Sequence, residues 1–224
     1  LFEFSEALKR RFAFVEIPAF QGRERRPDAG AMARLRDQLA TRAAFAGLEG
    51  RDFAAAFASV AGQVAEIVGR VRVLHPLGLA QVLDLLGYLI IARIYRDDAD
   101  AGTSEDLDAA LRDNLLPALE SHAAPRLGAL AALFDGSLKR WFAAFLEHGS
   151  GGYQIDPQWA QVAAELLSVD GEVAGKVDGR ERDIAAWKQW IGEAEPTLTG
   201  EFAAMPALAN FAAALRRLAA QREL

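Results

Sequence analysis

Apolar residues recur at helical spacing through most of this 224-residue chain, and that periodicity restricts the fold more than any other feature. One long stripe runs from Phe53 to Val71. The next, Leu79 to Ile94, is apolar around most of its circumference. Spacings of three and four residues place side chains on one face of an α-helix, and a helix that is apolar all round belongs in a core. Similar patterns cover residues 28–39, 103–116, 127–146, 157–167, 180–191 and 206–222. The chain is therefore predicted to be mainly α-helical.

Turn-forming residues separate these predicted helices. Pro27 and Asp28 are a typical helix start, and Thr103 with an acidic residue three positions later forms a sequence like a capping box. The helix that begins at Thr103 is expected to bend or end at Pro117. The Gly-Ser-Gly-Gly sequence at 149–152 is typical of a linker, and the glycine-rich interval 171–179 is predicted to be a loop.

The composition excludes several classes of protein. Hydrophobic residues make up 52% and charged residues 25%, which is typical of a globular chain. The net charge of −6 gives no overall basic field, so nucleic acid is a disfavoured partner, and the arginines at 23–26 are interpreted as a solvated connector. The chain has no cysteine, and its three histidines are far apart in the sequence, so no metal site is predicted.

No segment is predicted to cross or enter a membrane. The N-terminus lacks the charged, apolar and small-residue order of a signal peptide. The longest apolar run, Val82 to Ile94, contains Asp84 and is shorter than the roughly 20 residues that span a bilayer. We interpret it as a buried core helix and predict a cytoplasmic protein.

The N-terminal region contains the one convincing strand pattern. Phe12 to Ile17 is apolar on both faces, as in a strand buried on both sides of a parallel sheet. A single strand is not stable without ladder partners, and the chain offers no second one. The chain also begins with Leu1 rather than methionine. We therefore expect it to be an internal fragment whose partner strands lie upstream.

Residues 5–18, S-E-A-L-K-R-R-F-A-F-V-E-I-P, resemble the end of the nucleotide-binding core of AAA+ ATPases. The resemblance is to the dynein-related branch that includes MoxR-like and McrB-like proteins. There, a helix ending in A-L-R/K-R-R-F leads into the last core strand. The resemblance implies that Arg10 or Arg11 reaches the nucleotide of a neighbouring subunit as an arginine finger, which contributes roughly 10³–10⁵ in rate in related systems. The sequence does not say which one. By themselves, these cations are more typical of a helix C-terminus, where they complement the helix dipole.

The stretch H-P-L-G-L-A-Q at 75–81 has the order of the second sensor of AAA+ proteins, at the start of a lid helix. The resemblance places Pro76, Gly78 and Gln81 beside the nucleotide. Many members carry a sensor arginine just after this glycine, whereas Leu79 and Ala80 follow it here. Arg70 or Arg72 would have to approach from the preceding helix. The alternative is a plain interhelical turn. The run L-L-P-A-L-E at 115–120 also resembles a late lid helix, and the resemblance covers roughly residues 1–120.

The implied fold is the helical lid domain of an AAA+ ATPase, with one residual core strand near the N-terminus and a C-terminal helical extension. Residues 1–20 would end the core, 21–148 would form the lid, and 149–224 the extension, which is also the candidate docking region for an unknown protein client. The full-length protein would bind ATP, or GTP as in McrB-like members, with Mg, in a ring of neighbouring protomers that is usually hexameric. No phosphate-binding loop occurs in this chain, so by itself it is not expected to hold or hydrolyse nucleotide. The alternative function is a non-enzymatic, all-helical protein–protein interaction module.

Overall fold

The computed structural model describes residues 25–45, 51–95, 103–150 and 155–222, and in these ranges the protein is helical, with turns and no strand. The predicted helix at 5–11, the predicted strand at 12–17, and Arg10 and Arg11 lie outside the described residues. The helices are α2 (Ala29–Phe45), α3 (Arg51–Val71), α4 (Leu79–Tyr95), α5 (Thr103–Asn114), α6 (Leu116–Leu119), α7 (Ala124–Asp135), α8 (Leu138–Ser150), α9 (Pro157–Leu167), α10 (Ile184–Glu201), the 3₁₀ turn η1 (Pro206–Leu208) and α11 (Ala209–Arg222).

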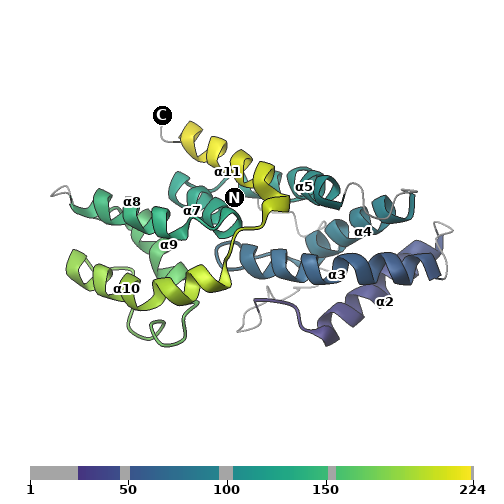
Figure 1. Cartoon of the computed structure of the whole chain (residues 1–224), viewed down its shortest axis with the longest axis horizontal. Coiled ribbons are helices and arrows are strands. Elements are labelled where there is room, and N and C mark those ends of the chain that lie inside the picture. The colour runs from purple at the N-terminus through teal and green to yellow at the C-terminus, as the bar shows by residue number, and fades with distance from the viewer. Residues whose placement is uncertain (1–24, 46–50, 96–102, 151–154, 223–224) are drawn as a thin grey trace, which may run out of the picture.

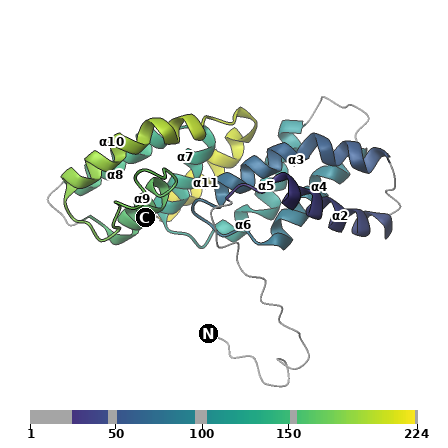
Figure 2. The ribbon, with the colours of Figure 1, turned by 90° about the horizontal axis from the view of Figure 1, so that it is seen from below.

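The helices form an elongated body (Figure 1). Helices α2, α3 and α4 lie at one end and α8, α9 and α10 at the other, while α7 and α11 lie between the two groups (Figures 1 and 2). The mainly α-helical fold predicted from the periodicity is confirmed in the described ranges. The buried side chains of both ends belong to one continuous hydrophobic cluster. Because α11 packs against α7 and α5, the two sides of the predicted boundary at 148 share this core.

The first three helices follow the sequence pattern closely. Asp28 caps α2, since its Oδ1 accepts a hydrogen bond from the Ala31 amide at 2.6 Å. The stripe of α3 is buried, with Val64, Ile67 and Val68 fully inaccessible to solvent. Helix α4 packs beside α3 and buries most of its circumference, as predicted for a core helix.

Two breaks occur where the sequence supplies proline and glycine. Helix α5 ends at Asn114, and Pro117 lies in the first turn of the short α6, where its missing amide costs no hydrogen bond. The predicted helical region 127–146 is divided into α7 and α8 at Gly136. This glycine has φ +72° and ends α7 in the left-handed conformation.

The C-terminal helices agree with the predicted ranges, except at α10. Helix α9 occupies the predicted range 157–167. Helix α10 begins at Ile184 rather than near 180, because Asp183 caps it through the Ala185 amide at 2.9 Å. It then continues past the predicted end and through Pro196 to Glu201. The predicted loop at 171–179 contains turns and irregular backbone, with no helix or strand.

A cluster of aromatic rings fills the core between α8, α9 and α10. Trp187 is fully buried and meets Phe145 edge to face at 5.1 Å between ring centroids. Trp190 lies beside it at 5.3 Å. Trp187 is therefore part of the core, while Trp190 is partly exposed at its edge.

Within the described residues, Phe53–Val71 of α3 is long and apolar enough to cross a membrane by length and composition alone. Helices α10 and α11 pass the same test only as one segment bent by 92°. In the structure, α3 lies between α2, α4 and α7 and directs its apolar stripe into the core. This burial is compatible with the core helix of a soluble protein.

Candidate functional site

The three predicted sensor residues in the described part of the chain lie together where α3 passes into α4. We call residues 72–78 the α3–α4 turn. The turn is joined to the end of α3 by a hydrogen bond from the His75 amide to the Val71 carbonyl, at 2.8 Å. Pro76 and Gly78 are exposed on this turn, and Gln81 is half-buried one helical turn later. Gln81 Oε1 accepts from the Gly78 amide at 3.0 Å, which is one half of a capping box.

A pocket of about 140 Å³ lies beside the α3–α4 turn. Its walls are mainly apolar and come from α2 and the first turn of α4. The lining residues are Pro27, Ala31, Arg34, Leu35, Gln38, Arg72, Leu79 and Val82. Because complete ligand pockets enclose roughly 300–1,000 Å³, this one has room for only part of a small molecule.

Of the two arginines considered for the sensor position, the structure brings only Arg72 to this pocket. The Arg72 guanidinium donates to the Leu77 carbonyl at 3.2 Å, so it is held against the α3–α4 turn. Burial lowers the pKa of Arg72, but a guanidinium remains charged at neutral pH. Arg72 therefore places a positive charge at the edge of an apolar pocket.

Arg70 points the opposite way, into the centre of the molecule, and is only 5% exposed. Its Nη1 donates to the carbonyls of Leu133 and Ala203, at 2.5 and 2.7 Å, and its Nε donates to Glu66 at 2.9 Å. Leu133 belongs to the last turn of α7, whose carbonyls have no partner within the helix. Arg70 therefore has a structural role: it connects α3 to α7 and to the segment between α10 and α11.

Two cations of the arginine-rich connector reach the same region. Arg26 pairs with Glu66 at 2.9 Å, and Arg25 lies 3.7 Å from Glu201. Together with Arg70 they border a polar hollow of about 300 Å³. Each of these connector arginines thus faces a carboxylate rather than presenting an unopposed positive charge.

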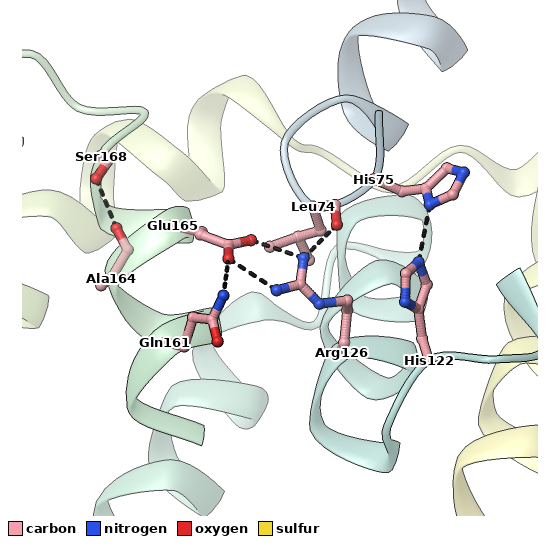
Figure 3. A network of polar contacts seen from close by, with 8 residues as sticks. All are labelled: Leu74, His75, His122, Arg126, Gln161, Ala164, Glu165 and Ser168. Atoms are coloured by element: carbon pink, nitrogen blue, oxygen red, sulfur yellow. Dashed lines mark hydrogen bonds and ion pairs between the residues drawn. The ribbon is translucent and has the colours of Figure 1, made fainter. Parts of the chain in front are cut away.

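Also on the α3–α4 turn, His75 meets His122 (Figure 3). His75 Nδ1 and His122 Nε2 are 2.8 Å apart, so one ring donates a hydrogen bond to the other. Burial lowers the pKa of His75 to about 4, and the neighbouring His122 and Arg126 act in the same direction. Burial and Arg126 lower the pKa of His122, and Glu165 opposes them. Both rings are therefore neutral at pH 7.

This histidine pair was not predicted, because 47 residues separate its members and no spacing rule connects them. The pair does not belong to a larger ligand set. Within the residues that the structure describes, no group of three or more His, Cys, Asp or Glu side chains could hold a metal ion.

Arg126 forms a second contact between the α3–α4 turn and the rest of the protein (Figure 3). Its Nη1 donates to the Leu74 carbonyl. The same guanidinium binds Glu165 of α9 through two hydrogen bonds of 2.7 Å each. Gln161 steadies that carboxylate from one turn earlier on α9, at 3.0 Å. The α3–α4 turn is therefore connected to a helix about 90 residues further along the chain.

Comparison with known proteins gives no assignment for this chain: no family model, no curated protein and no solved structure matches it.

Proposed function

We propose that this chain is the C-terminal part of an AAA+ ATPase, with residues 21–148 forming the nucleotide-sensing lid. One observation carries the proposal. The partly buried cation of Arg72 borders an apolar pocket at the start of α4. The resemblance implies that the helix at this position in the chain is the one that senses nucleotide. The trans-acting roles of Arg10 and Arg11 rest on the resemblance of residues 5–18, since both lie outside the described residues.

The chemistry of the pocket supports this proposal. The side chains of Leu79, Val82 and Leu35 offer apolar contact to the flat face of a base. The start of a helix carries a partial positive charge, and Arg72 adds a full one, so phosphate oxygens would be favoured nearby. The small volume of the pocket suits a lid that covers one side of a nucleotide while an upstream core binds the rest.

In this proposal, hydrolysis moves one rigid unit against another. The lid would contact the nucleotide of its own subunit, and Arg10 or Arg11 would contact the γ-phosphate bound to the neighbour. Loss of the γ-phosphate would remove the contacts that hold the two units together, and the resulting rotation would remodel a client protein. ATP or GTP with Mg would be bound by the full-length ring, and the region 149–224 would offer a surface to the client.

The test uses the protein with its upstream coding sequence and measures steady-state ATP hydrolysis together with the affinity for a fluorescent ATP analogue. Substitution of the finger residue (Arg10→Ala or Arg11→Ala) should reduce hydrolysis about 10³-fold or more and change nucleotide affinity little. Arg72→Ala should weaken nucleotide binding itself. Lys9→Ala and Arg36→Ala are matched controls and should leave both quantities unchanged.

Two results would contradict the proposal. The first is an upstream sequence without a phosphate-binding loop. The second is an unchanged rate of ATP hydrolysis in all three variants: Arg10→Ala, Arg11→Ala and the double variant.

The alternative function, a non-enzymatic helical interaction module, is favoured by one feature of α4. Tyr88, Ile91 and Tyr95 are 38%, 50% and 72% exposed, and their spacing places them along one face of the helix. Aromatic residues on a surface are enriched in protein–protein contacts. An initiator methionine directly before Leu1 would support this alternative against the ATPase.

A further inference from the structure

The α3–α4 turn is held against the body of the protein by contacts from outside its own helices. Leu74 is 2% exposed, and its carbonyl accepts a hydrogen bond from Arg126 on α7. His75, the next residue, contacts His122 just before α7. Since both histidines are neutral at pH 7, the Arg126 contact is the charged one of these two contacts.

The position of Arg126 depends in turn on α9. The two 2.7 Å hydrogen bonds to Glu165 match the planar fork of the guanidinium to the two carboxylate oxygens, and this geometry fixes orientation as well as distance. The Arg126 side chain is 17% exposed and that of Glu165 31%, so solvent screens the pair less than it would on an open surface. Figure 3 shows that the guanidinium lies between Glu165 and Leu74.

We infer that Glu165 and Arg126 are positioning residues through which the C-terminal region, residues 155–222, sets the conformation of the α3–α4 turn. When the carboxylate is in place, the guanidinium is oriented toward the Leu74 carbonyl and the turn stays closed. When α9 moves or Glu165 loses its charge, the guanidinium is no longer oriented and the turn opens more often. Resting on the proposed function, this link would let a protein bound to the C-terminal region change how the lid responds to nucleotide.

The coupling itself is tested on the 224-residue chain without nucleotide, by amide hydrogen exchange. Glu165→Gln keeps the shape of the side chain and removes its charge. Loss of one charge-assisted contact should raise the exchange of the Leu74 and His75 amides, which both bond to the Val71 carbonyl, by roughly tenfold. The control is Glu193→Gln. It removes the 2.9 Å ion pair between Glu193 and Lys176 in the same C-terminal region, with no connection to the turn.

A second variant separates positioning from simple stabilisation of α7 against α9. The charge-swapped double variant, Arg126→Glu with Glu165→Arg, restores an ion pair between the two helices. It also places a carboxylate where the Leu74 carbonyl needs a donor. Exchange at the turn should therefore remain fast in the double variant. Exchange restored to the wild-type rate would overturn the inference, as would Glu165→Gln behaving like Glu193→Gln.

The consequence for nucleotide is tested separately, with ATP hydrolysis by the protein that includes its upstream sequence. Glu165→Gln should change the nucleotide concentration at half-maximal rate at least threefold. If exchange at the turn responds and hydrolysis does not, the regulatory consequence is wrong. The proposed ATPase function is then unaffected, because Arg10→Ala and Arg11→Ala test it independently.

Discussion

Removal of the buried Arg70 guanidinium should be among the most destabilising single changes in this protein. Arg70→Met keeps the length of the side chain and deletes its charge and donors. The Leu133 and Ala203 carbonyls then lose their bonds of 2.5 and 2.7 Å, and Glu66 loses one of its two cations. An unsatisfied buried polar group costs about 1–3 kcal/mol. The buried Leu133 carbonyl carries this cost, and the part-buried contacts to Ala203 and Glu66 are hydrogen bonds to a charged group, which contribute about 1.5–3 kcal/mol. We therefore expect a loss of about 3–5 kcal/mol in total.

Arg70 also has a favourable electrostatic position that methionine does not keep. Its positive charge lies at the C-terminal end of α7, where helix carbonyls concentrate negative charge. It also lies over the Phe202 ring, with its central carbon 5.8 Å from the ring centroid. Methionine replaces these interactions with apolar packing, which offsets part of the loss.

Thermal and urea unfolding measure this loss directly. For a chain of this size, 1 kcal/mol corresponds to about 2–4 °C in Tm, so Arg70→Met should lower Tm by roughly 6–20 °C. The control, Arg36→Met, removes an arginine whose side chain is 51% exposed and pairs with the neighbouring Asp37, and it should change Tm by about 1–2 °C at most. Hydrogen exchange adds a local measurement. The Met205 amide bonds to the Phe134 carbonyl at 2.8 Å next to the Arg70 contacts, and it should exchange faster in Arg70→Met. A loss of stability no larger than that of Arg36→Met would refute the reasoning.

Two further predictions concern pH and the end of α7. Because the fold lowers the pKa of His75 from 6.5 to about 4, the unfolded chain binds more protons than the folded chain between these values, and stability falls as pH falls. His75 should contribute about 1–2 kcal/mol to the loss of unfolding free energy between pH 7 and pH 5. Urea midpoints at the two pH values should therefore show a smaller loss of stability for His75→Gln than for the wild type. An equal loss in the two proteins would refute the lowered pKa of His75. Gly136→Ala should destabilise by more than about 1 kcal/mol, because Gly136 has φ +72° and an added Cβ would lie 2.9 Å from the Ala204 nitrogen. Gly62→Ala in α3, where nothing lies within 4 Å, should instead stabilise by about 0.5–1 kcal/mol, and a Tm ranking in the opposite order would contradict this account.

The local signals in the sequence predicted the helices because each depends on residues close together in the chain. The burial of α3 and α4 follows from the spacing of their apolar residues, and the start of α2 follows from Asp28. The apolar pattern at 127–146 fits one or two helices, and Gly136 supplies the left-handed residue that divides α7 from α8. The end of α10 was missed because the predicted range stopped at Ile191, whereas the helix continues through Pro196 to Glu201.

The tertiary structure alone decided which distant residues meet. The sequence indicated that Pro76, Gly78 and Gln81 share a turn, since they are neighbours in the chain, and it left open whether Arg70 or Arg72 lies near them. In the structure, Arg72 lies at the pocket and Arg70 lies in the core. These positions depend on where α2 and α7 pack, because α2 forms a wall of the pocket and α7 supplies a carbonyl that accepts from Arg70.

The same reason explains the contacts that no pattern revealed. His75 and His122 are 47 residues apart, and Arg126 and Glu165 are 39 residues apart. Periodicity and capping report only interactions within about one helical turn, so they determine the helices and their buried faces. The pairing of side chains across helices depends on how those faces pack together, and for this protein that packing created the connection between the α3–α4 turn and α9.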